Sequence, residues 1–185
     1  MPAKINASTS SGLVVDSDLT GSLKLQTGGN DALSIDSSQV VNFTKQFQFG
    51  GVLPPAFSVH ASSNQSVTTT VSTKILFQTE LFDTNNNFAS SRFTPTVAGY
   101  YQFNAYLSPN TVVTRTLVML YKNGVRVNIL LDGTSVPGTG GGGTILYLNG
   151  TTDYVEIYGR LDGTSPEYNS ASDSTYFSGA LIRAA

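Results

Sequence analysis

Apolar residues recur at every second position over much of the chain after about residue 55, and this alternation constrains the fold more than any other feature. In residues 99–107, for example, Tyr101, Phe103, Ala105 and Leu107 share one side of an extended chain. No segment keeps a helical period. The alternating runs are separated by Asx-Gly pairs, which tolerate the positive φ angles of tight hairpins. The pattern therefore predicts antiparallel β-strands. The four pairs are Asn123-Gly124, Asp132-Gly133, Asn149-Gly150 and Asp162-Gly163.

A glycine-rich stretch interrupts this alternation. Five of the six residues from Gly138 to Gly143 are glycine, which predicts a mobile surface loop. A phosphate-binding loop is the functional alternative. We reject it because the Gly-Lys-Ser/Thr sequence is missing and no helix is predicted to follow.

Aromatic residues form a recognisable pattern within the alternating part of the chain. Phe88 and Phe93 precede Gly99-Tyr-Tyr-Gln-Phe103, and the chain closes with Phe177-Ser-Gly179. This pattern resembles the C1q-like branch of the C1q/TNF jelly-roll superfamily over about residues 55–185. The resemblance implies an all-β jelly-roll sandwich of ten strands that assembles as a compact trimer. It does not imply an enzyme.

Strand parity predicts which side chains fill the space between the two sheets. Alternate residues on adjacent strands of a sandwich face the same interior. The expected core residues are Phe77, Phe93, Tyr101, Phe103, Val155, Ile157, Phe177 and Leu181.

The opposite parity leaves tyrosine-rich faces on three expected strands, residues 99–107, 154–158 and 176–182. In the family that the chain resembles, these three strands lie together in the inner sheet, whose outer face packs around the three-fold axis. Tyrosine suits an interface because its ring buries area while its hydroxyl keeps a polar partner. The alternative is that the tyrosines decorate a solvated sheet. The expected trimer-interface residues are Tyr100, Gln102, Asn104, Tyr106, Tyr154, Tyr158, Tyr176 and Ile182.

Residues 1–50 differ in composition from the rest of the chain, because serine, threonine, glycine and asparagine dominate and aromatic residues are absent before Phe43. Short alternating bursts of apolar residues, split by glycine and serine, predict short strands in an N-terminal attachment arm. A disordered leader is the alternative. Residues 51–55 form the expected Gly/Pro hinge, and residues 56–185 the jelly-roll domain. The apolar residues expected in the arm are Leu13, Val15, Leu23, Leu25, Leu33, Ile35 and Phe43.

Composition excludes several partners. Only 12% of residues are charged, the net charge is −2, and the basic residues are scattered, so binding to nucleic acid through phosphate neutralisation is not expected. No segment approaches the ~20 apolar residues that span a bilayer, and no insertion in a membrane is expected. Residues 1–25 lack the apolar run of a signal peptide, which favours synthesis in the cytoplasm.

The residues that catalysis or a metal site would need are also scarce. The chain has no cysteine and one histidine, His60, so the common zinc ligands are missing. No Gly-x-Ser-x-Gly elbow is present, and we expect no catalytic residues. Calcium is the one metal to consider, because some relatives in the resembled superfamily bind it at the top of the trimer, but a metal-free protein is the expectation. The carboxylates expected in or near loops are Asp132, Asp153, Asp162, Glu167 and Asp173.

These inferences lead to a functional hypothesis. We expect a bacteriophage virion structural protein: a homotrimeric capsid decoration (cement) or head-fibre protein that attaches to other virion proteins through its N-terminal arm. It would be made in the host cytoplasm and reside on the virion surface. The alternative is a phage tail-fibre or host-binding module whose apical loops recognise a ligand such as a glycan. A secreted C1q-like signalling or defence protein is a third possibility.

Overall fold

The computed structural model describes residues 23–27, 30–35, 37–43, 54–134 and 138–185. Within these ranges the chain is all β, with sixteen strands and no helix. None of the described residues therefore forms a helix long and apolar enough to cross a membrane. The chain divides into two compact units, Met1–Gly51 and Val52–Ala185.

The first unit contains a three-stranded antiparallel sheet in the order β1-β2-β3. Its strands are β1 (Leu23–Thr27), β2 (Asn30–Ile35) and β3 (Val41–Phe43). Leu33 pairs with Leu25 on one side and with Phe43 on the other, so the expected arm residues from Leu23 to Phe43 lie on paired strands. Two further arm residues, Leu13 and Val15, lie outside the described residues.

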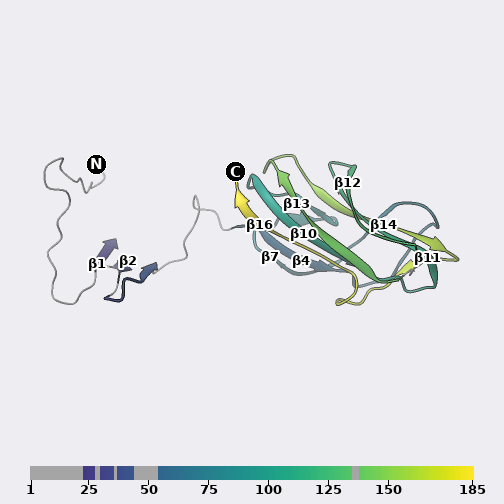
Figure 1. The fold of residues 1–185 in the computed structure, drawn as a ribbon, viewed down its shortest axis with the longest axis horizontal. Helices are drawn as coiled ribbons and strands as arrows, with labels where there is room; N and C mark the ends of the chain where they lie inside the picture. The colour runs from purple at the N-terminus through teal and green to yellow at the C-terminus, as the bar shows by residue number, and fades with distance from the viewer. Residues whose placement is uncertain (1–22, 28–29, 36, 44–53, 135–137) are drawn as a thin grey trace. The chain divides into compact units, whose positions relative to one another are not determined.

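The second unit is a sandwich of two antiparallel sheets, which confirms the predicted jelly roll (Figure 1). The five-stranded sheet has the order β13-β10-β16-β4-β7, with β13 (Gly140–Leu148), β10 (Gly99–Leu107), β16 (Tyr176–Ala184), β4 (Ala56–His60) and β7 (Thr79–Asp83). The six-stranded sheet has the order β12-β11-β14-β9-β8, with β12 (Val125–Gly133), β11 (Val113–Lys122), β14 (Val155–Gly163), β9 (Arg92–Phe93) and β8 (Phe88–Ala89), while β6 (Thr73–Lys74) also pairs with β14. A small separate sheet joins β15 (Glu167–Tyr168) to β5 (Gln65–Ser66).

The strand β12 ends the six-stranded sheet, and it is irregular. Its pairing with β11 shifts register twice, between Val118 and Met119 and between Leu120 and Tyr121. Such bulges bend a strand and interrupt its ladder of hydrogen bonds.

A cluster of aromatic rings fills the space between the two sheets. Phe57 stacks on Phe93 with ring centroids 4.4 Å apart and meets the Phe177 ring edge-on at 4.9 Å. Phe93 in turn lies 5.9 Å from Phe103 and 5.5 Å from Tyr101. These five rings come from both sheets, so they join the two layers directly.

The core residues expected from the sequence lie in this buried cluster, except Leu181, which is half-buried and packs against it. Tyr101 is fully buried, and its hydroxyl donates to the Val97 carbonyl oxygen over 2.7 Å. Burial raises the pKa of Tyr101 to about 12, because the ionised phenol would lose its hydration.

The glycine-rich stretch is not the loop that the sequence predicts. Residues Gly140–Gly143 begin β13, which pairs with β10 along its whole length. Glycine is required there by close packing: a Cβ on Gly141 would overlap the Ala105 carbonyl oxygen, and one on Gly142 would lie 2.6 Å from the Leu130 carbonyl oxygen of β12. The small residues let the edges of the two sheets approach each other.

The aromatic core gives a first prediction. Phe103→Ala removes a fully buried ring and leaves a cavity, so we expect it to lower the free energy of unfolding by about 3–5 kcal/mol. Urea denaturation at one fixed protein concentration measures the loss. Val112→Ala, at a side chain that is 94% exposed, is the control and should change the stability by less than about 0.5 kcal/mol. Equal small changes in both variants would show that the Phe103 ring does not support the core.

Candidate functional site

The outward side of the five-stranded sheet carries two pairs of tyrosines. Tyr100 of β10 pairs with Tyr147 of β13, and their rings lie 5.5 Å apart in an edge-to-face arrangement. Tyr106 of β10 pairs with Tyr176 of β16, and these rings stack 5.7 Å apart at an interplanar angle of 10°. The two pairs sit toward opposite ends of β10. We call this surface the tyrosine face. Its residues are Tyr100, Gln102, Asn104, Tyr106, Ile145, Tyr147, Tyr176, Ser178 and Ile182.

The centre of the tyrosine face is polar. Gln102 and Asn104 lie between the two tyrosine pairs, and the Gln102 amide donates to Asn104 Oδ1 over 3.2 Å. Gly143 lies opposite Asn104, and a Cβ there would collide with the Asn104 side chain. Any surface that covers this face must therefore supply hydrogen-bonding groups at its centre, because a buried amide without a partner is costly.

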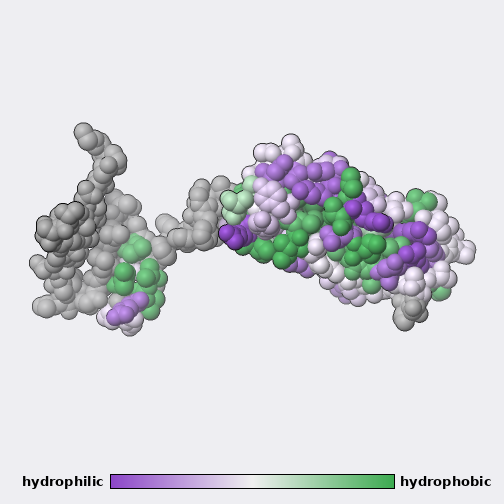
Figure 2. Space-filling view, turned by 45° about the horizontal axis from the view of Figure 1, so that its top comes forward, coloured by the Kyte–Doolittle hydropathy of each residue, from purple (hydrophilic) through white to green (hydrophobic). Residues whose placement is uncertain are grey.

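One end of the tyrosine face is apolar and hollowed. Ile145 and Ile182 are 52% and 55% exposed, next to Tyr100, which is 46% exposed. Together with the residues from Arg183 to Ala185 they line a shallow hollow of about 480 Å³. Ile182 lies at a bulge, since the register of β16 shifts between the partners of Tyr100 and Tyr101. Figure 2 shows hydrophobic residues gathered between polar ones on the visible side of this unit.

Two expected interface residues, Tyr154 and Tyr158, do not belong to the tyrosine face. The strand β14 pairs with β11 and β9 in the six-stranded sheet, so Tyr158 faces outward from the opposite layer of the sandwich, and Tyr154 immediately precedes β14. The prediction that the three tyrosine-rich strands share one sheet is wrong. Alternation along a strand determines which side chains share a side, but the partners of the strand are set by contacts distant in sequence.

Sequence reasoning also missed two exposed members of the face, Ile145 and Tyr147. They follow Gly140–Gly143, for which the sequence predicts a loop, and this prediction hides the strand that begins there. Their own spacing, two residues apart, was the signal that could have identified β13.

The outward side of the six-stranded sheet holds a buried carboxylate, Glu156, whose side chain is 4% exposed. Its Oε1 accepts hydrogen bonds from Lys74 Nζ over 2.7 Å and from Arg92 Nε over 2.9 Å. The Arg92 guanidinium also lies 3.7 Å above the centre of the Tyr154 ring, in cation–π geometry. Burial of the Glu156 carboxyl tends to raise its pKa, but the hydrogen bonds from Lys74 and Arg92 outweigh burial and hold the pKa below its ordinary value of 4.5.

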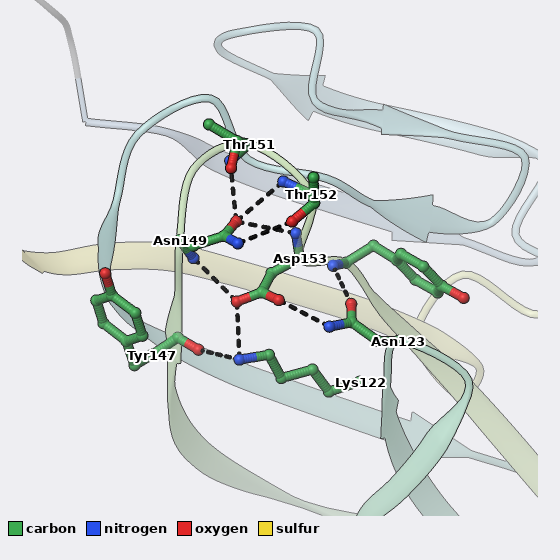
Figure 3. A network of polar contacts seen from close by, with 8 residues as sticks. Lys122, Asn123, Tyr147, Asn149, Thr151, Thr152 and Asp153 are labelled. Carbon is green, nitrogen blue, oxygen red and sulfur yellow. Dashed lines mark hydrogen bonds and ion pairs between the residues drawn. The ribbon is translucent and has the colours of Figure 1, made fainter.

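A second polar network fixes the turn before β14 (Figure 3). Asn149 Oδ1 accepts hydrogen bonds from the backbone N–H groups of Thr151, Thr152 and Asp153. The Asp153 carboxylate accepts from Lys122 Nζ over 2.8 Å, and its other oxygen accepts from Asn123 Nδ2 over 2.7 Å. The hydrogen bond from Lys122, supported by that from Asn123, holds the pKa of Asp153 below its ordinary value. The network joins the β11–β12 hairpin to this turn, so its role is structural.

The carboxylates considered for calcium lie mostly against nitrogen donors. Asp132 forms a bidentate pair with Arg115, Asp162 does the same with Arg160, and Glu167 accepts from the amides of Asn64 and Asn110. In the part of the chain that the structure describes, no three His, Asp or Glu side chains converge as metal ligands would. The single histidine, His60, lies on β4 opposite Tyr176.

The sandwich and its strand order define a C1q/TNF-like domain, a module that is typically trimeric and non-enzymatic. The sequence model of the C1q domain matches residues 56–182, and the chain belongs to that family.

Two solved structures illustrate the similarity. The globular domain of the zebrafish complement 1qA protein is 25% identical, with a TM-score of 0.55, and the match covers 72% of this chain and 100% of that one. Murine APRIL at pH 8.5 is 9% identical, with a TM-score of 0.54, and covers 70% of this chain and 100% of that one, which shows the fold alone. A search of curated proteins found no match.

The Glu156 ion pairs give a pH-dependent prediction. Because the pKa of Glu156 is lower in the folded than in the unfolded chain, its stabilisation is fully present above about pH 4.5 and is lost as the pH falls through the folded-state pKa. We therefore expect the Tm of the native protein to fall more steeply below pH 4.5 than the Tm of Glu156→Gln. Calorimetry between pH 7 and pH 2 measures both curves, and parallel curves would contradict the proposed pairing.

Proposed function

We propose that this protein is a homotrimer whose protomers meet through the tyrosine face. The observation that carries the proposal is the set of exposed aromatic and apolar side chains on that face, with Tyr100, Tyr147, Ile145 and Ile182 each more than 40% exposed. Neighbouring large apolar groups of this kind on a single sheet face are typical of interaction surfaces. Tyrosine is also enriched in protein interfaces. Membership of a family whose domains typically form trimers supports the same assembly.

We further propose that the trimer is a virion structural protein, a capsid decoration or head-fibre protein that attaches through its N-terminal arm. The division of the chain into two units supports separate roles for attachment and for the projecting head. The complete absence of cysteine suits a protein made in a reducing cytoplasm that later works outside it. On this proposal the protein resides on the virion surface.

A phage tail-fibre or host-binding role is the second candidate for the same trimer. The two roles differ in copy number: a decoration protein binds capsid shells in many copies, whereas a receptor-binding fibre is present in few and binds cells or polysaccharide. We propose no catalytic role. The buried carboxylates Asp153 and Glu156 serve ion pairs that hold strands and turns together.

The assembly is tested by placing a charge on the tyrosine face. Tyr100→Asp would put a carboxylate in a surface that loses its water on assembly, so we expect the trimer to dissociate at micromolar concentration. Sedimentation velocity measures the mass. Val112→Asp places the same charge on an exposed loop outside this face and should leave the trimer intact. A native protein that sediments as a monomer at micromolar concentration would refute the proposal.

The attachment role is tested by truncation. A chain that begins at Leu53 should remain folded and trimeric, because the sandwich and the tyrosine face belong to Val52–Ala185. It should fail to join virus particles, which a binding assay with purified capsid shells and tails would measure. Normal incorporation of the truncated chain would contradict attachment through the N-terminal arm.

A further inference from the structure

The outward side of the six-stranded sheet carries a second surface whose residues the fold does not use for its core. Directly paired residues of antiparallel strands share a side of the sheet, so the register places Arg126 of β12, Tyr121 of β11 and Glu156 of β14 in one row. The next row holds Met119 and Tyr158, and Lys74 of β6 lies opposite Tyr158. On the other side of β14, Arg92 of the paired strand β9 extends the first row, and its Nε donates a hydrogen bond to Glu156.

Aromatic rings line this surface. Tyr121 and Tyr158 stack with ring centroids 4.0 Å apart, and both remain partly exposed. Tyr154, also partly exposed, lies beneath the Arg92 guanidinium. The three tyrosine rings thus lie beside the charged side chains on the same side of the sheet. The cationic tyrosine surface, as we call it, consists of Lys74, Arg92, Tyr121, Arg126, Tyr154, Glu156 and Tyr158.

Positive charge is in excess here, although the whole protein has a net charge of −2. At one end of the sheet Arg115 and Arg160 are neutralised by Asp132 and Asp162, with which they form bidentate pairs. On the cationic tyrosine surface itself, three basic residues face the single carboxylate of Glu156, so two positive charges remain uncompensated. The three basic residues are Lys74, Arg92 and Arg126.

Two of these basic groups keep free hydrogen-bonding capacity. Arg92 donates to Glu156 through Nε, and no acceptor among the described residues takes a hydrogen bond from its two terminal nitrogens. Arg126 is exposed and forms no ion pair within the described part of the chain. A guanidinium offers paired N–H donors that match the two oxygens of a carboxylate. The Glu156 and Tyr154 contacts hold the Arg92 group in place, which lowers the entropy lost on binding.

We propose that the cationic tyrosine surface binds a polysaccharide that carries carboxylate groups. Its arginines would pair with the carboxylates, while the tyrosine rings pack against the C–H faces of the sugars. Arg126 and Arg92 lie on strands separated by three strand spacings, roughly 14 Å, so they suit successive groups of an extended chain better than one small anion. A nucleic acid is disfavoured, because two uncompensated charges neutralise too few phosphates for useful affinity.

This inference goes beyond the proposed trimer and does not depend on it. The cationic tyrosine surface and the tyrosine face lie on opposite layers of the sandwich, so assembly through one layer leaves the other available.

The experiment measures binding of the full-length protein to oligogalacturonate by calorimetry, with dextran of similar length as the neutral probe. We expect binding to oligogalacturonate that weakens with added salt, and none to dextran. Arg126→Gln should weaken it about tenfold, the loss expected for one charge-assisted contact, while Tm stays unchanged. Arg115→Gln is the matched control and should bind as the native protein does, because Arg115 of β11 is already paired with Asp132 and lies outside both the cationic tyrosine surface and the tyrosine face.

Tyr121→Ser is a second variant that tests the aromatic part, and it should also weaken binding. The proposal is overturned if the native protein does not bind oligogalacturonate at millimolar concentration, or if Arg115→Gln loses as much affinity as Arg126→Gln. Tighter binding to a single-stranded thymidine oligonucleotide than to oligogalacturonate would overturn it too, since the partner would then be a nucleic acid. Sedimentation velocity of each variant shows whether the trimer still forms, so a loss of polysaccharide binding can be distinguished from a loss of assembly.

Discussion

The packing of Phe57 between the two sheets is the contact on which the rest of the structure depends. The Phe57 ring packs against Phe93 of the six-stranded sheet and against Phe177 of its own five-stranded sheet. Gly179 makes room for this ring, because a Cβ at that position would lie 2.8 Å from the Phe57 ring and 2.7 Å from the Phe103 ring. The rings set the distance between the layers. Because each strand alternates, this inward packing also determines which side chains form the two outward surfaces.

Much of the fold could be predicted because its signals are local. The alternation of Tyr101, Phe103 and Phe177 with polar neighbours identifies buried positions without any knowledge of strand pairing. Two of the four Asx-Gly pairs identify turns for the same reason: at Asn123-Gly124 both residues have positive φ angles, 53° and 78°, and Gly150 has a φ of 71°. The other two pairs do not adopt this geometry, since Gly133 and Gly163 are the last residues of β12 and β14. These features depend on a few consecutive residues, which a single sequence displays completely.

The arrangement of the surfaces could not be predicted in the same way. Tyr158 alternates as Tyr106 does, yet β14 pairs with β11 and so carries it to the opposite layer. Gly141 belongs to β13 because this segment pairs with β10, and it must be glycine there because the Ala105 carbonyl oxygen leaves no space for a Cβ; both reasons are absent from the local sequence. The ion pairs of Glu156 involve Lys74 and Arg92, 82 and 64 residues away, and nothing local distinguishes this glutamate from an exposed one.

The bulges of β12 have a consequence for how copies of this protein behave when crowded. An edge strand with a regular row of unpaired N–H and C=O groups invites another chain to add to the sheet, and repeated addition produces aggregates. The two register shifts of β12 interrupt its row of N–H and C=O groups. The edge of the five-stranded sheet, at the glycine-rich start of β13, also lies close against β12. Growth by backbone pairing is therefore blocked on this side. Copies of the protein that meet on this side therefore contact one another through side chains and not through a shared ladder of backbone hydrogen bonds.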